Sequence, residues 1–133
     1  MLRNFDLLIQ LGLDYLTLGQ RLDSFSGGER QRLKLTRELK NTNQIIILDE
    51  PSTGLHPSDT QKLLTFFNGL ADQNNTLIVI EHNLDIISQA DWIIDMGPGA
   101  GKFGGEVLFE GTPVDLLKNK KSFTAEFLRK HIQ

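Results

Sequence analysis

The chain has 133 residues, of which 39% are hydrophobic and 23% charged, a size and composition typical of one globular domain rather than a disordered chain. Its formal net charge of -3 excludes a strongly basic nucleic-acid module, so any contact with DNA would need a local patch. The absence of cysteine excludes disulfides and thiolate metal sites, and the lack of a long apolar run predicts a cytoplasmic protein without a membrane segment.

The first third of the sequence predicts two helices. Apolar residues in a helical rhythm predict a short helix over 4–11, which Gly12 ends. Ser24 or Ser26 is a suitable cap for a second helix that runs to about Lys40. The inward positions expected in this second helix are Leu33, Thr36 and Leu39. Its basic residues are expected to face outward, and they are Arg30, Arg32, Lys34, Arg37 and Lys40.

The middle of the sequence predicts a βαβ unit. Residues 45–48 form a continuous β-branched and apolar run, typical of a parallel strand that is covered on both faces. Residues 77–80 repeat this pattern. Between the two runs, Pro57 starts a series of apolar residues at helical spacing, which predicts a crossover helix with a right-handed connection.

The last third predicts shorter elements. They are a helix over 84–89, strands over 92–96 and 106–110, and helices starting at Thr112-Pro113 and at Ser122. Trp92 is predicted to pack in the core. Val107 and Phe109 are predicted to share one face of the last strand, opposite its two glutamates.

A glycine pair opens the second helix, within the run from Ser26 to Gln31. Glycines let a backbone approach a phosphate closely, and the first turn of a helix adds unpaired N–H groups and the positive end of the helix dipole. An ordinary loop-to-helix junction has the same dipeptide. The phosphate-binding interpretation is favoured because a strand ending in two carboxylates follows at a short distance.

Those carboxylates are Asp49 and Glu50, at the end of a strand where open α/β sheets bind their ligands. Asp49 is suited to hold Mg²⁺ through water, and Glu50 to polarise or deprotonate an attacking water. His82 follows the next strand after one residue, so its imidazole is suited to sense a γ-phosphate. His56 and His131 are expected to be structural or merely exposed.

A phosphate-binding loop of the form Gly-x-x-x-x-Gly-Lys-Ser/Thr does not occur in the sequence. The run from Gly97 to Phe103 is the nearest approach, but Met96 stands where the first glycine is required. Phe103 stands in place of the hydroxyl residue after Lys102. This run is therefore expected to be a glycine-rich surface loop.

The motifs together resemble the ATP-binding-cassette (ABC) ATPases, with a signature at Ser26 to Gln31 and a Walker B strand at Ile45 to Glu50. Within this superfamily the chain is similar to the UvrA family along nearly its whole length. The run Glu81 to Asp85 also matches, and the more specific matches are Ser52 to His56 and Ala90 to Asp95. Phe25 stands where the family usually has leucine, and the family's phosphate loop, glutamine loop, DNA-contacting insertion and zinc modules are absent from these residues.

The resemblance implies roles for individual residues, with ATP and Mg²⁺ as cofactors. Asp49 would bind the metal through water, Glu50 would activate water, and His82 would contact the γ-phosphate. The ATP would be held on an opposing cassette, so two cassettes would have to close on each other. The residues expected to contact that ATP are Ser26, Gly27, Gly28, Glu29, Ser52 and Gly54.

The resemblance also implies the fold, an α/β C-terminal part of an ABC-type P-loop domain with a mostly parallel sheet. Residues 1–44 would be the signature-helix region, and residues 45–133 would hold the Walker B strand, D-loop and switch histidine. The strand before the phosphate loop would be missing between the strands over 77–80 and 92–96. We therefore expect the rest of the cassette as a partner, or a sheet that re-pairs.

The function expected is that of a fragment of a UvrA-like ATPase that couples ATP hydrolysis to damage recognition in nucleotide excision repair, inactive alone. Partners would be a second cassette and, through the full-length protein, DNA and a UvrB-like protein, with no membrane. One alternative is a UvrA-like drug-resistance or transport-associated ATPase. Another is a non-catalytic module that only dimerises.

Overall fold

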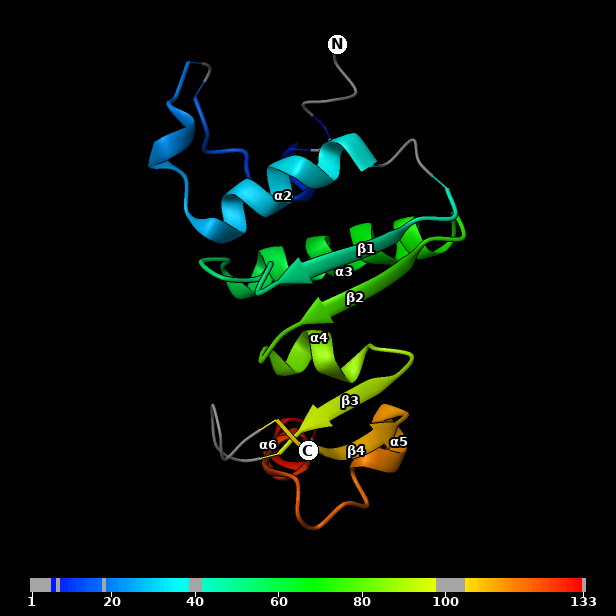
Figure 1. Cartoon of the computed structure of the whole chain (residues 1–133). Helices are drawn as coiled ribbons and strands as arrows, with labels where there is room; N and C mark the ends of the chain where they lie inside the picture. The colour runs from blue at the N-terminus through cyan, green and yellow to red at the C-terminus, as the bar shows by residue number, and fades with distance from the viewer. Residues whose placement is uncertain (1–5, 7, 18, 39–41, 98–104, 133) are drawn as a thin grey trace. The chain divides into compact units, whose positions relative to one another are not determined.

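The computed structural model describes residue 6 and residues 8–17, 19–38, 42–97 and 105–132 (Figure 1). It divides into two compact units, Met1–Glu81 and His82–Gln133. The boundary expected between the regions 1–44 and 45–133 lies inside the first unit, so it differs from the division between the two units. Most of the glycine-rich loop expected from Gly97 onward, residues 98–104, lies outside the described residues.

The first unit contains the expected βαβ arrangement. Strand β1 (Ile45–Asp49) and strand β2 (Thr76–Ile80) are parallel, with a register that runs from Ile45 opposite Thr76 to Asp49 opposite Ile80. Helix α3 (Pro57–Ala71) connects them and begins at the predicted proline. Its N-cap is His56, whose Nδ1 accepts a hydrogen bond from the Ser58 backbone N–H at 3.3 Å, a structural role as expected.

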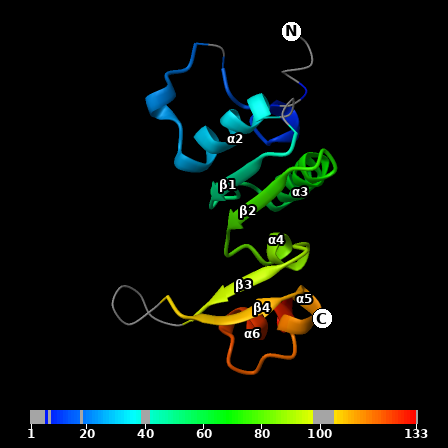
Figure 2. The same cartoon turned by 45° about the vertical axis from the view of Figure 1, so that its right-hand side comes forward.

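One face of this strand pair is covered and the other is open. Helix α3 lies on one face in both views (Figures 1 and 2), where Ile46 and Leu48 are buried. The opposite face exposes Ile45, Ile47, Ile78 and Ile80, by 71%, 66%, 49% and 56%. The prediction of a strand covered on both faces is wrong for the described residues, because a crossover helix packs on a single face and no second described element covers the other.

The signature region forms α2 (Gly27–Glu38), preceded by the 3-10 helix η1 (Leu22–Ser24). Residues 8–10 are helical, in agreement with the short helix predicted there. The buried positions of α2 include Leu35 and Arg32, each 1% exposed, whereas Leu33 and Thr36 are half-buried. The outward orientation predicted for Arg32 is therefore wrong. The predicted inward residue Leu39 lies outside the described residues.

The described residues of the second unit form a two-stranded sheet and three helices. Strands β3 (Ile93–Met96) and β4 (Val107–Gly111) are antiparallel. The helices are α4 (Leu84–Ser88), α5 (Pro113–Leu116) and α6 (Phe123–His131). Thr112 and Ser122 cap α5 and α6 as predicted, since each side chain accepts a backbone N–H three residues on. The core cluster is Ile93, Leu116, Ala125 and Leu128.

Two expectations for this unit are corrected. Trp92 is 59% exposed, because it precedes β3 on the same alternating face as Ile94 and Met96, which are also exposed. The register shifts between Asp95 and Met96, whose partners are Phe109 and Val107. One extra residue in β4 turns Val107 outward, 55% exposed, while Phe109 packs on the core, so the two do not share a face.

In the described part of the chain, β2 pairs only with β1, and β3 pairs only with β4. No direct ladder joins the strands expected over 77–80 and 92–96. This is the pairing expected when a strand that belongs between them is missing from the described residues.

Candidate functional site

The first turn of α2 is closed by a capping box. The Glu29 backbone N–H donates to Ser26 Oγ at 3.2 Å, and the Ser26 N–H donates to Glu29 Oε2 at 2.5 Å. This reciprocal pair satisfies two backbone donors that a helix start otherwise leaves open. Ser26 remains exposed, and its side chain also hydrogen-bonds the Glu29 carboxylate.

Tyr15 fixes the other carboxylate oxygen of Glu29. The Tyr15 hydroxyl donates to Glu29 Oε1. This hydrogen bond, followed by the Ser26 backbone N–H, holds the pKa of Glu29 below its ordinary value. Burial, then the Glu29 carboxylate, raises the pKa of Tyr15. Both carboxylate oxygens of Glu29 are thus bound inside the chain, which makes it a support for the helix start, and its expected contact with ATP stays a prediction.

The two glycines of the motif have different surroundings. Gly27 is exposed, and a Cβ built on it would meet nothing within 4 Å. Gly28 is buried, and a Cβ there would lie 3.0 Å from the Thr53 carbonyl oxygen and 3.5 Å from that of Glu50. Gly27 therefore leaves room for a phosphate at the start of this 12-residue helix. Gly28 allows the helix to approach the loop after β1.

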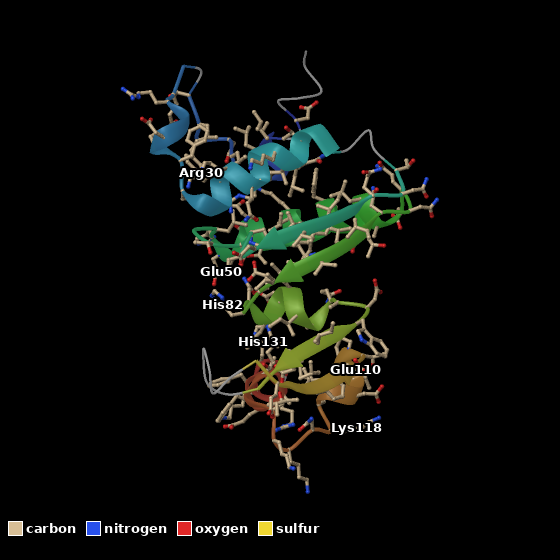
Figure 3. The ribbon with its side chains drawn as sticks, in the orientation of Figure 1. Arg30, Glu50, His82, Glu110, Lys118 and His131 are labelled. Carbon is tan, nitrogen blue, oxygen red and sulfur yellow. The ribbon has the colours of Figure 1, made fainter. Side chains whose placement is uncertain are left out.

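The carboxyl end of β1 presents Asp49 and Glu50, both exposed. The Asp49 N–H donates to Gln31 Oε1 at 3.0 Å, which ties β1 to α2. The Glu50 N–H continues the ladder by donating to the Ile80 carbonyl at 2.9 Å. Glu50 then adopts a φ of 47°, a left-handed conformation that is uncommon outside glycine. The chain turns sharply at this residue, whose carboxylate is labelled in Figure 3.

The loop after β1 is held by hydrogen bonds within the first unit. The Thr53 N–H donates to the Glu50 carbonyl at 3.1 Å, closing a turn, and Thr53 Oγ1 donates to Glu50 Oε2 at 3.4 Å. The Ser52 N–H donates to Glu81 Oε1 at 2.8 Å, from the end of β2. Gly54 is exposed with a φ of 78°, which favours glycine.

Arg32 connects α2 to this loop from inside the protein. Its Nη1 donates to the Pro51 carbonyl at 2.6 Å and to the Thr53 carbonyl at 3.2 Å. Its Nε is buried and has no hydrogen-bond partner. Burial lowers the pKa of Arg32, and nearby Tyr15 and Glu29 oppose that shift.

The first unit thus contains Asp49, Glu50 and all six residues expected to contact the ATP of the opposing cassette. His82 begins the second unit, where it is exposed and precedes Asn83, the N-cap of α4. Its expected role toward a γ-phosphate stays a prediction. His131, in α6, is hydrogen-bonded to Asp85 Oδ1 at 2.8 Å, the structural role expected of it.

The described residues contain no cluster of three or more His, Asp or Glu side chains that would hold a metal ion by themselves. The donor set at the end of β1 instead suits Mg²⁺, which keeps several waters and takes one or two carboxylates together with phosphate oxygens. Asp49 is the exposed carboxylate in the strand itself and fits such a site.

Sequence reasoning missed three supporting residues, Tyr15, Arg32 and Glu81. Their partners lie 14, 19 and 29 residues away in the sequence, so no local pattern reveals the contacts. The capping box from Ser26 to Glu29 did have a local signal, a serine followed three residues later by glutamate.

None of the described helices has the length and apolar character needed to span a membrane.

Known proteins with similar sequences agree with the motifs. The family described as ABC transporter matches residues 4–53. The UvrABC system protein A of Aquifex aeolicus (strain VF5) is 48% identical over 134 residues, covering 98% of this chain and 14% of the relative. The same-named protein of Escherichia coli (strain K12) is 52% identical over 130 residues, covering 96% of this chain and 14% of the relative.

A solved structure shares the fold. The crystal structure of UvrA2 from Deinococcus radiodurans superposes with a TM-score of 0.88 at 42% sequence identity, covering 98% of this chain and 16% of that chain. The chain therefore spans about one seventh of the length of the relatives that it matches.

Proposed function

Because the chain belongs to the UvrA family of ABC ATPases, we propose that it supplies the signature helix and the water-activating carboxylate of an ATP-hydrolysing cassette. In the complete protein, hydrolysis is proposed to be coupled to recognition of damaged DNA in excision repair. The observation that carries this proposal is within the first unit. The exposed start of α2 and the exposed Glu50 both contact the loop that follows β1. Gly28 of α2 packs against the Thr53 carbonyl, and the Thr53 N–H donates to the Glu50 carbonyl.

In this proposal Ser26 and the open backbone at Gly27 bind the terminal phosphate of an ATP held on an opposing cassette. Helix N–H groups and the dipole of α2 favour the anion there. Asp49 holds Mg²⁺ through water, and Glu50 accepts a proton from the attacking water. Bound ATP supplies the phosphoryl group and Mg²⁺ neutralises its charge. Ser52 and Gly54 lie near the same phosphate in this proposal, and His82 contacts it.

The partners proposed follow from this half-site. A second cassette provides the triphosphate, and the remaining part of the same cassette provides a phosphate loop. DNA and a UvrB-like protein are proposed to bind through the full-length protein, and the cytoplasm is proposed as its location. The open face at Ile45, Ile47, Ile78 and Ile80 is consistent with a further cassette segment packing on this sheet.

The test is a reconstitution. Labelled ATP is titrated into the chain alone and into the chain mixed with the N-terminal cassette half of the Aquifex aeolicus relative. We expect no turnover by the chain alone, rescue of hydrolysis by the mixture, and loss of that hydrolysis with Glu50→Gln. The matched control is Glu110→Gln, which neutralises an exposed glutamate of β4.

Two outcomes would overturn the proposed half-site, and a third, measured with damaged DNA added to the mixture, would overturn its link to repair. Association without any rescued hydrolysis would support a module that only dimerises. Turnover in the mixture that Glu50→Gln leaves intact would remove Glu50 from the reaction. Hydrolysis that damaged DNA does not alter would favour the drug-resistance or transport-associated branch over repair.

A further inference from the structure

We infer that Arg32 is the positioning residue that couples the start of α2 to Glu50, so that the phosphate-binding helix turn and the water-activating carboxylate move as one body. This inference rests on the proposed function. Arg32 touches neither a phosphate nor the reacting water in that proposal. It acts through the loop backbone.

The first step in the argument is the cost of burying Arg32. A guanidinium that is 1% exposed loses its hydration, and only specific contacts offset that loss. Arg32 Nη1 has two carbonyl acceptors, at 2.6 Å on Pro51 and 3.2 Å on Thr53, while Nε has none. A side chain kept only for core packing would not need a charge. The two carbonyls that Arg32 binds both belong to the loop that follows β1, and Arg32 also hydrogen-bonds the Tyr15 side chain.

The second step is the geometry of that loop. Pro51 and Thr53 lie directly after Glu50, and the Thr53 N–H closes the turn on the Glu50 carbonyl at 3.1 Å. Glu50 itself is in the left-handed region, with a φ of 47°. A residue in this region persists only where its surroundings hold it there. By binding the carbonyls on either side of Ser52, Arg32 holds the turn that sets the direction of the Glu50 side chain.

The third step links the loop to the helix start. Arg32 lies on α2 one turn after Gly28, and its Nη1 is 3.2 Å from the Cβ position of Gly28. The same Cβ position is 3.0 Å from the Thr53 carbonyl. A shift of the loop therefore has to displace the first turn of α2, where Ser26 and Gly27 are exposed. Arg32 therefore connects the two halves of the proposed site, beside the hydrogen bond from the Asp49 N–H to Gln31 Oε1.

Two substitutions separate this role from a general contribution to the core. Arg32→Lys keeps the charge but presents a single ammonium in place of the planar guanidinium. Arg32→Met removes the charge while filling a similar volume. Proteins often keep their stability when a buried charged residue is replaced in this way. Arg129→Lys is the matched control, because Arg129 Nη1 also binds two carbonyls, those of Leu117 at 2.6 Å and Asn119 at 3.2 Å.

The first measurement is amide hydrogen exchange on the chain itself, which needs no ATP. Loss of hydrogen bonds to a charged group lowers local stability, so we expect exchange at Thr53 and Leu55 to accelerate about tenfold or more in both Arg32 variants. The amides of β1 should keep their protection. Arg129→Lys should leave Thr53 and Leu55 unchanged. Unchanged exchange in the Arg32 variants, or failure of both to fold, would overturn the inference.

The second measurement is steady-state hydrolysis in the mixture with the relative's N-terminal cassette half. Misplacement of a catalytic group lowers the rate of the chemical step. We therefore expect kcat to fall about tenfold or more with KM nearly unchanged. Arg32→Lys should retain more activity than Arg32→Met. Faster loop exchange with unchanged kcat would overturn the coupling while leaving the proposed function intact. Insensitivity of hydrolysis to Glu50→Gln would instead refute the proposed function.

Discussion

The backbone of Gly28 approaches that of Thr53 so closely that a Cβ on Gly28 would lie 3.0 Å from the Thr53 carbonyl oxygen. The signature glycine is thus explained by contact between a helix and a loop of the same chain. Its neighbour Gly27 has open space at the corresponding point. Two adjacent glycines therefore serve different purposes, one in packing and the other in leaving a surface accessible.

Substitution of the two glycines by alanine should give opposite results. Gly28→Ala forces the helix and loop apart, and overpacking of this kind costs roughly 1–3 kcal/mol. Gly27→Ala should be neutral or slightly stabilising, because alanine favours the helix and meets no neighbour. Urea unfolding of the two variants and the wild type measures the difference. Equal stability of Gly28→Ala and Gly27→Ala would contradict the packing role.

Capping and phosphate binding at Ser26 can be separated by the choice of substitution. Ser26→Ala removes the acceptor for the Glu29 N–H and should cost about 1 kcal/mol of stability. Ser26→Asp keeps a capping acceptor but places a negative charge where a phosphate is proposed to bind. Both variants should lose hydrolysis in the reconstituted cassette, whereas only Ser26→Ala should lose stability.

The control for Ser26 is Ser122→Ala, which removes the N-cap of α6. It should lower stability with no effect on ATP affinity or turnover of the folded protein. Full activity of Ser26→Asp would rule out a phosphate contact by this side chain.

The link between Tyr15 and Glu29 predicts a pH dependence. The pKa of Glu29 is lowered from an ordinary 4.5, chiefly by the Tyr15 hydroxyl. Because the folded-state pKa lies below the unfolded value, the stabilising contribution is present above the unfolded pKa and is lost as pH falls through the folded pKa. Tyr15→Phe removes the hydrogen bond and should reduce the stability lost on acidification below pH 4.5. Urea unfolding between pH 7 and pH 3 gives the free energy of unfolding of the wild type and of Tyr15→Phe at each pH. If this free energy fell equally with pH in the two proteins, the prediction would be contradicted.

The open face of the β1–β2 pair predicts unequal tolerance of neighbouring residues in one strand. Leu48 is 4% exposed, so Leu48→Ala should cost about 2–5 kcal/mol. Ile47 is 66% exposed, and Ile47→Thr should change the stability of the chain by about 0.5 kcal/mol or less. Thermal unfolding of the isolated chain tests both. A large loss with Ile47→Thr would show that another element covers this face.

Much of the local structure could be predicted from single segments. Residues 45–48 and 77–80 were predicted as strands and Pro57 as a helix start, and the structure confirms all three. The reason is that β-branched runs and capping residues act through their immediate neighbours. The prediction failed for Val107, because a single extra residue in β4 changed the face to which it points.

By itself, the sequence determined the order of the elements, a serine cap at the start of α2 and the placement of Asp49 and Glu50 at the end of a strand. These features depend on residues at most a few positions apart. Only the tertiary structure decided that Arg32 is buried under the loop, that Gly28 contacts Thr53, and that one sheet face is open. Each depends on which distant segments pack together, since burial and hydrogen bonding are set by neighbours in space rather than along the chain.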